Sequence, residues 1–214
     1  MNSSYSGLFL AEGTSDLPLA RLVETPFLER DVPLRLSTPD FTKLPRVPKD
    51  LPRRRDYCVR DLLRSEPVVV LVVHRDADNA GSDARRTEIL DAVASCSIAQ
   101  EAIPVVPIRM TESWLLLDGA AIRQRAGNPR GRQPIPLPPP GEVERIGNPK
   151  ERLQRCLLEA AAATGRRRRE VRQRCNSHRR ELLNGLDPAG PVSRLRGWRE
   201  MVDEIDKVAA RLGR

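Results

Sequence analysis

The stretch from Val68 to Asn79, VVVLVVHRDADN, decides the fold class. Its first six residues are valine or leucine, without the alternation of apolar and polar side chains that a half-buried strand shows. Such an unbroken apolar run is typical of a central parallel strand that is buried on both faces. The run leads directly into His74-Arg75-Asp76-Ala77-Asp78, so charged residues gather where the strand is expected to end.

Further strand-then-helix units lie on both sides of this stretch. The sequence predicts strands over residues 7–11, 32–36, 68–73 and 102–110. Pro104 and Pro107 favour an edge position for the last of them, and the 32–36 strand is also expected at an edge. This order predicts an α/β fold with a mostly parallel sheet flanked by helices.

The helical segments suggest how the chain divides into domains. Helices are predicted over residues 17–23, 56–65, 83–100, 111–118, 150–183 and 192–212, with a break near Gly165. Residues 25–55 are rich in proline and charge and are expected to be weakly structured. We therefore predict a sheet domain over residues 1–120, an exposed Pro/Gly/Arg-rich linker over 121–149 and a basic helical appendage over 150–214.

Charge is distributed unevenly along the chain. Residues 1–118 hold 15 Lys/Arg against 18 Asp/Glu, whereas residues 119–214 hold 22 against 11, so the net charge of +8 is C-terminal in origin. A basic region of this kind indicates a polyanionic partner. Aromatic residues make up only 3% of the chain, which argues against recognition by base stacking.

The remaining composition limits the class of protein. The four cysteines are scattered without a CxxC pair, so no zinc site is expected. Neither a signal-like leader nor an apolar run of about 18 residues is present, so we expect no membrane span and a cytoplasmic location.

Acidic residues follow two of the predicted strands. Glu12 comes after the first strand, and Asp76 and Asp78 come after the central one. If the chain stays extended there, residues two apart project to the same side and can approach one cation. Mg²⁺ prefers carboxylate oxygens and water, with substrate phosphates completing its shell. The alternative for Asp76 and Asp78 is that they cap the next helix or lie in a solvated loop.

Three segments together resemble the TOPRIM domain of topoisomerases, primases and OLD-family nucleases: LFLAEGTSD, VVVLVVHRDADN and PVVPIRMTESWLLLD. The resemblance covers residues 5–118. It implies that Glu12 acts as general acid/base or metal ligand and that Asp76 and Asp78 hold Mg²⁺ or Mn²⁺. It further implies a metal-dependent endonuclease that hydrolyses nucleic-acid phosphodiesters.

In particular, the chain resembles a family of small stand-alone TOPRIM-like proteins that are often encoded beside ATPases. This implies an ATPase partner and a role in defence against phage. In the OLD-like arrangement with two ions, Glu112 or Asp16 completes the second metal site. Without the resemblance, Glu112 and Asp16 are ordinary acidic residues in the first turn of a helix. The alternative function is a non-catalytic interaction subunit that docks on an ATPase and binds nucleic acid or protein.

A dense cationic run lies within the 150–183 segment. On a helix these arginines surround most of the circumference, which favours sequence-independent contacts with phosphates. The alternative is a solvated helix or a surface for an acidic protein partner. The predicted phosphate contacts are Arg166, Arg167, Arg168, Arg169, Arg172, Arg179 and Arg180.

Overall fold

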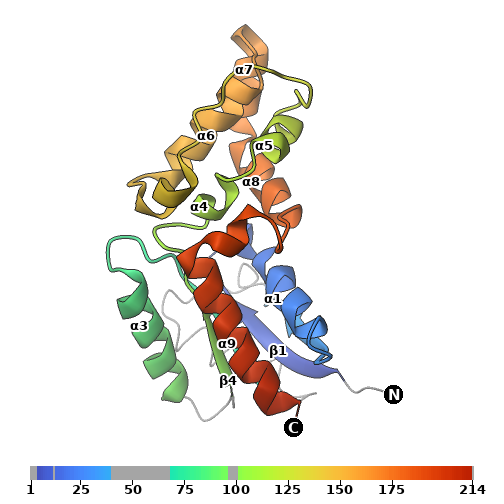
Figure 1. Ribbon diagram of the computed structural model, residues 1–214, viewed down its shortest axis with the longest axis vertical. Coiled ribbons are helices and arrows are strands. Elements are labelled where there is room, and N and C mark those ends of the chain that lie inside the picture. The colour runs from blue at the N-terminus through green and yellow to red at the C-terminus, as the bar shows by residue number, and fades with distance from the viewer. Residues whose placement is uncertain (1–3, 12, 40–67, 96–100, 214) are drawn as a thin grey trace, which may run out of the picture. The chain divides into compact units, whose positions relative to one another are not determined.

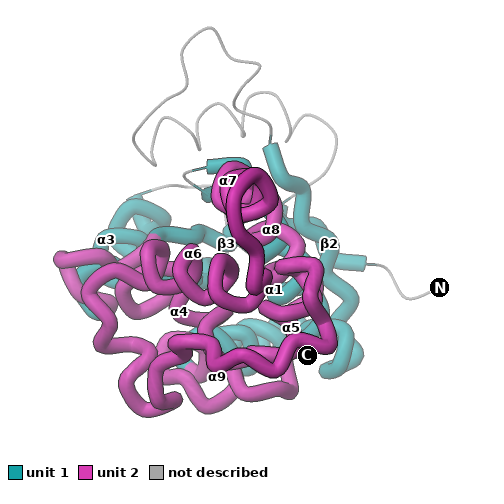
Figure 2. The backbone as a smooth tube through the Cα atoms, turned by 90° about the horizontal axis from the view of Figure 1, so that it is seen from above, with its two compact units in different colours: residues 1–75, 83–106, 200–214 teal, residues 76–82, 107–199 magenta. Residues whose placement is uncertain are grey.

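The computed structural model describes residues 4–11, 13–39, 68–95 and 101–213. The chain forms two compact units, shown in different colours in Figure 2. The sheet unit contains residues 1–75, 83–106 and 200–214, and the helical unit contains residues 76–82 and 107–199. This division differs from the predicted linear one, because the chain passes between the units several times and residues 200–213 belong to the sheet unit.

Four parallel strands form the sheet, in the order β2-β1-β3-β4. The fold is therefore α/β, as predicted. The central position of β3 is confirmed, since it pairs with β1 on one side and β4 on the other. Both predicted edge strands, β2 and β4, lie at the edges. The strands are β1 (Tyr5–Leu10), β2 (Leu34–Ser37), β3 (Val70–His74) and β4 (Glu101–Val105).

Close packing holds the middle of the sheet together. Every residue of β3 is buried, in agreement with its unbroken apolar sequence. Gly7 of β1 leaves room for its neighbours: a Cβ atom there would lie 2.7 Å from Leu36 Cδ2 and 2.8 Å from the carbonyl oxygen of Val70. A larger residue at this position would force strands apart.

The helix after β1 is longer than the sequence predicts. A short 3₁₀ helix, η1 (Thr14–Asp16), precedes α1 (Leu19–Leu28), which continues past Thr25 into the segment expected to be weakly structured. Pro26 and Phe27 are both buried and extend the apolar face of the helix, which offsets the missing N–H of the proline. The helix predicted over residues 56–65 lies outside the described residues.

The C-terminal helix α9 (Arg196–Leu212) contributes residues 200–212 to the sheet unit. Buried Met201, Ile205, Val208 and Ala209 form one apolar stripe at helical spacing. In Figure 1 this helix lies in front of the strands beside α1. The stripe can be buried only against an apolar surface, and this explains why the helix does not belong to a separate basic appendage.

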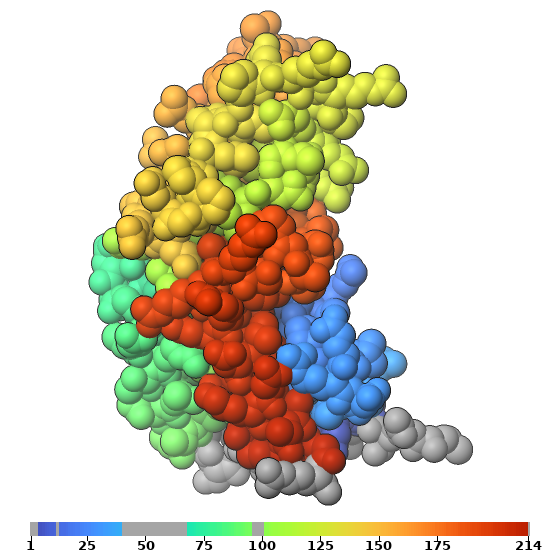
Figure 3. Space-filling view, viewed as in Figure 1, coloured from blue at the N-terminus to red at the C-terminus, as the bar shows by residue number. Residues whose placement is uncertain are grey.

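Polar contacts tie α9 to the elements around it. The Tyr5 hydroxyl donates to the carbonyl oxygen of Leu212. Ion pairs link α9 to the turn after α1, to α3 (Ser82–Ala94) and to β4, and Figure 3 shows α9 side chains lying against those of α1 and α3. The pairs are Arg30–Asp206, Arg86–Glu204 and Arg211–Glu101.

The helical unit consists mainly of short helices. Its elements are α4 (Glu112–Leu115), α5 (Gly119–Arg125), η3 (Pro140–Arg145), α6 (Pro149–Ala160), α7 (Gly165–Gln173), α8 (Cys175–Asn184), η4 (Pro191–Arg194) and the first residues of α9. The predicted break near Gly165 is confirmed, and that residue has a φ of 53°. A second break at Arg174 separates α7 from α8 and was not predicted.

Two tryptophans lie in the core of this unit. The rings of Trp114 and Trp198 meet edge to face, with centroids 5.0 Å apart and an interplanar angle of 76°. The segment predicted as an exposed linker has no helix or strand between residues 126 and 139, but it is held against the helices. The carbonyl oxygen of Pro136 accepts from the Arg152 guanidinium and from the Cys156 thiol.

Candidate functional site

The strand order creates one position at which ligands of open α/β sheets usually bind. The chain goes from β1 outward to β2 and then returns to β3 on the other side of β1. β1 and β3 are therefore neighbouring parallel strands whose connections leave in opposite directions. Ligands of such sheets bind beyond the carboxyl ends of the strands at this switch point. Asp76 follows the last residue of β3 by two positions in the chain.

In the helical unit, residues 76–78 run alongside residues 107–109. The backbone N–H of Ala77 donates to the carbonyl oxygen of Pro107, and that of Asp78 donates to Arg109. Asp78 has a φ of 46° and begins a turn. The chain is therefore not extended through Asp78, and the strand alternation that would place both carboxylates on one side does not apply.

Asp76 is half-buried and holds the start of α4. Its Oδ1 accepts a hydrogen bond from the backbone N–H of Thr111 at 2.8 Å and another from the Thr111 hydroxyl at 3.0 Å. Thr111 is the N-cap residue of α4, as predicted, but its side chain makes no capping bond within that helix. Two donors on one oxygen fix the orientation of the carboxylate.

Asp78 is exposed at the turn. The Arg109 guanidinium donates to the carbonyl oxygen of Asp78 at 3.5 Å and to Asn79 Oδ1 at 3.2 Å. A cationic side chain therefore lies next to Asp76-Ala77-Asp78, which we call the DxD segment. No sequence pattern singles out Arg109, which has a left-handed φ of 71° and whose carbonyl oxygen accepts from the backbone N–H of Asp78.

Glu112 lies in a different environment from the two aspartates. It is buried, and its Oε1 accepts a hydrogen bond at 2.8 Å from Arg179 Nε in an ion pair. Its second oxygen, Oε2, is buried and has no hydrogen-bond partner among the described residues. Arg179 already neutralises the charge that the predicted second metal site would use.

The other two predicted acidic ligands are Glu12 and Asp16. Glu12 lies outside the described residues. Asp16 is largely buried in η1 of the sheet unit, where its Oδ2 accepts a hydrogen bond from the Ser15 hydroxyl at 3.0 Å. The environment of Asp16 agrees with that of an acidic residue in the first turn of a helix.

The donor chemistry at the DxD segment fits a hard cation. Asp76 and Asp78 offer carboxylate oxygens, which Mg²⁺ and Mn²⁺ prefer. Among residues 4–11, 13–39, 68–95 and 101–213, no group of three or more histidine, cysteine, aspartate or glutamate side chains lies together. A centre with three acids requires Glu12, so it stays a prediction.

The predicted phosphate-binding arginines fall into three groups. Arg166, Arg167 and Arg168 are engaged with Glu170, with the carbonyl oxygen of Gly127 and with Glu159, respectively. Arg179 is buried in its pair with Glu112, so its guanidinium does not face solvent. The exposed arginines that form no ion pair with any described residue are Arg169, Arg172 and Arg180.

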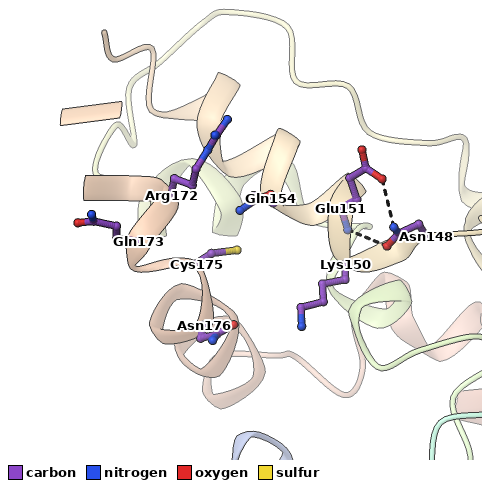
Figure 4. Close-up of a pocket in the computed structure, with 8 residues that line it drawn as sticks. All are labelled: Asn148, Lys150, Glu151, Gln154, Arg172, Gln173, Cys175 and Asn176. Atoms are coloured by element: carbon purple, nitrogen blue, oxygen red, sulfur yellow. Dashed lines mark hydrogen bonds between the residues drawn. The ribbon is translucent and has the colours of Figure 1, made fainter. Parts of the chain in front are cut away.

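A polar cavity of about 580 Å³ lies in the helical unit near these arginines. Figure 4 shows side chains from the start of α6 and from the junction of α7 and α8 around it. The thiol of Cys175 lines the cavity, and burial, reinforced by the charge of Glu112, raises the pKa of that thiol. Of the lining residues, only Arg172 was predicted from the sequence, as a phosphate contact; the others share no motif and are brought together only by the packing of three helices.

Two further findings concern membrane-spanning helices and similarity to known proteins. Within the described ranges, no helix is both long and apolar enough to cross a membrane. Comparisons with protein-family models, with curated proteins and with solved structures gave no match to this chain. The TOPRIM resemblance therefore remains a prediction from the sequence motifs.

Proposed function

We propose that the protein is a Mg²⁺-dependent nuclease that hydrolyses nucleic-acid phosphodiesters, with Glu12, Asp76 and Asp78 as its acidic centre. One observation carries this proposal: the DxD segment follows β3 directly, and β3 is the neighbour of β1 at the topological switch point of the sheet. Glu12 follows β1 by the same interval of two residues.

The residues have separate roles in this proposal. Bound Mg²⁺ or Mn²⁺ would polarise a phosphoryl oxygen and lower the pKa of its water. The two hydrogen bonds from Thr111 fix the carboxylate of Asp76, which would bind the metal in this proposal. Glu12 is the proposed general acid/base. The exposed Arg169, Arg172 and Arg180 would neutralise backbone phosphates.

A second candidate function is favoured by the contacts of the acids themselves. Asp76 anchors the start of α4, and Glu112 pairs with Arg179, so both carboxylates have structural partners without a metal. This supports a non-catalytic subunit that binds nucleic acid or protein, with an ATPase as partner. In that case, the acids stabilise the fold, and the binding of nucleic acid or protein does not depend on metal.

The two functions are separated by cleavage of plasmid and single-stranded DNA and RNA in Mg²⁺ or Mn²⁺, with EDTA as a control. Asp78→Ala is the informative variant, because Asp78 is exposed, whereas Asp76 also holds Thr111 at the start of α4. Asp76→Ala tests the second acid. Asp91→Ala, which removes an exposed aspartate of α3, is the matched control.

Cleavage that requires metal and is lost in Asp78→Ala and Asp76→Ala, but not in Asp91→Ala, supports the nuclease. No cleavage of any substrate, with or without an added ATPase and ATP, overturns it in favour of the interaction subunit. Cleavage that is unchanged in Asp78→Ala and Asp76→Ala also overturns the proposed centre, because it points to a contaminating enzyme or a different site.

A further inference from the structure

The polar cavity of the helical unit has the size of a ligand site. Its walls come from the N-terminal turns of α6, from the last turn of α7 and from the first turn of α8 (Figure 4). Its volume of about 580 Å³ is within the range of small-molecule sites. These three elements belong to one compact unit, so the cavity is formed within a single body of the protein.

The charge of the cavity is positive. Lys150 and Arg172 line it, and neither forms an ion pair with any described residue. The single carboxylate of the lining, Glu151, is engaged at its edge: Glu151 Oε2 accepts from Asn148 Nδ2 at 3.1 Å, and the Glu151 N–H donates to Asn148 Oδ1 at 3.1 Å. Figure 4 shows the side chains of Asn148 and Glu151 facing each other. The two cations are therefore not neutralised by the acid.

The neutral groups of the cavity add hydrogen-bond donors and no further negative charge. Gln154 and Asn176 supply side-chain amides. Burial raises the pKa of Cys175 above its ordinary value, so this thiol stays protonated at neutral pH. The described lining contains no aromatic ring, so the cavity offers nothing on which a base could stack.

We propose that this cavity binds a phosphate group, with Lys150 and Arg172 contacting the phosphate oxygens and the amides of Gln154 and Asn176 donating further hydrogen bonds. Charge-assisted hydrogen bonds from lysine and arginine are the usual means by which proteins hold phosphate. The phosphate can belong to a nucleic-acid backbone or to a free nucleotide. The inference uses none of the acids of the proposed metal centre, so it stands whether or not the protein cleaves nucleic acid.

Cys175 provides a reporter inside the cavity. Alkylation of Cys175 by iodoacetamide, an uncharged reagent, can be followed by mass spectrometry of its peptide in EDTA, which prevents any metal-dependent cleavage. The probes are inorganic phosphate, a nucleoside monophosphate, a short oligothymidylate and, as the uncharged comparison, the nucleoside alone. Sodium chloride at equal ionic strength controls for screening. Calorimetric titration with the same probes gives an independent measure of binding.

We expect phosphate-bearing probes to slow alkylation of Cys175 several-fold and the nucleoside to have no effect. Replacing both cations, Lys150→Ala with Arg172→Ala, is expected to weaken binding about tenfold or more. The matched control is Arg130→Ala with Arg132→Ala, which removes two exposed arginines of the same unit that do not line the cavity.

Each outcome decides a specific point. Tighter binding of the oligonucleotide than of the monophosphate identifies the source as a nucleic-acid backbone, and the reverse identifies a free nucleotide. The proposal is overturned if no phosphate-bearing probe protects Cys175 or gives heat of binding. It is also overturned if the control pair of substitutions weakens binding as much as the cavity pair, because the effect is then one of general charge.

Discussion

The ion pair between Glu112 of α4 and Arg179 of α8 is expected to be a main support of the helical unit. Its side chains are only 4% and 9% exposed, and Nε lies 2.8 Å from Oε1. The second oxygen of Glu112 is buried and has no hydrogen-bond partner among the described residues. Replacing Arg179 by methionine would keep most of the buried side-chain volume while leaving the carboxylate without its counter-charge.

The expected cost follows from this geometry. At the observed separation, the attraction between the two charges is roughly 6 kcal/mol for an effective dielectric constant of about 20. Desolvation of both groups offsets much of this, so the pair itself adds little net stability. Removing one partner forfeits the attraction while the desolvation cost of the other remains. We therefore expect Arg179→Met to lower the free energy of unfolding by about 3–5 kcal/mol.

The chain carries its own probe for this measurement. It has 2 tryptophans, Trp114 and Trp198, and both are buried in the helical unit. Urea unfolding followed by tryptophan fluorescence therefore reports on this unit. Arg180→Met, the exposed neighbour on the same helix, is the control and is expected to change stability by no more than about 0.5 kcal/mol.

A double variant tests the mechanism as well as the size of the effect. Replacing both groups, Glu112→Leu with Arg179→Met, removes the buried charge altogether and is expected to recover most of the lost stability. The reasoning is refuted if Arg179→Met unfolds within about 1 kcal/mol of the unmodified protein. It is also refuted if the double variant is no more stable than the single one.

Three further substitutions or conditions test other parts of the structure. Gly7→Ala is expected to cost about 1–3 kcal/mol in denaturant unfolding, since its Cβ would lie 2.8 Å from the Val70 carbonyl oxygen, whereas Gly141→Ala, with nothing within 4 Å, should be neutral. Asp118→Ala removes both hydrogen bonds that cap α5 and is expected to cost about 0.5–2 kcal/mol in thermal unfolding. Burial raises the pKa of Cys156 from 9.0 to about 11, so this thiol should stay protonated at pH 9 and ionise only towards pH 11, as thiolate absorbance compared with that of Cys156→Ala can check. Because the folded state keeps this proton, stability should fall as the pH rises from about 9 towards 11.

Sequence patterns predicted the elements whose cause is local. The β-branched run at residues 68–73 was sufficient to place β3 in the centre of a parallel sheet, since only a strand covered on both faces can bury such a run. Proline content placed β4 at an edge, and Gly165 marked the break between α6 and α7. The extension of α1 through Pro26 was missed, because local propensity disfavours proline there while tertiary burial favours it.

The candidate site was predicted only in part, because its chemistry depends on both sequence and packing. The order of strand and acid identified Asp76 and Asp78 as candidates, but the strand alternation assumed for them fails at the left-handed backbone of Asp78. The role of Thr111 was expected to be capping, and in the folded protein its hydroxyl and N–H instead orient Asp76. A hydrogen bond between residues 35 positions apart leaves no signal in a local pattern.

The sequence by itself therefore determined the fold class, the central strand, the acidic segment that follows it and the concentration of positive charge in the second half of the chain. Tertiary structure alone decided that Arg179 is buried against Glu112, that residues 200–212 of α9 belong to the sheet unit, and that Lys150 and Arg172 line one cavity. The physical reason is the separation along the sequence over which each effect acts. Periodicity and propensity act between residues a few positions apart, whereas ion pairing and cavity formation join residues that only the packing of distant helices brings together.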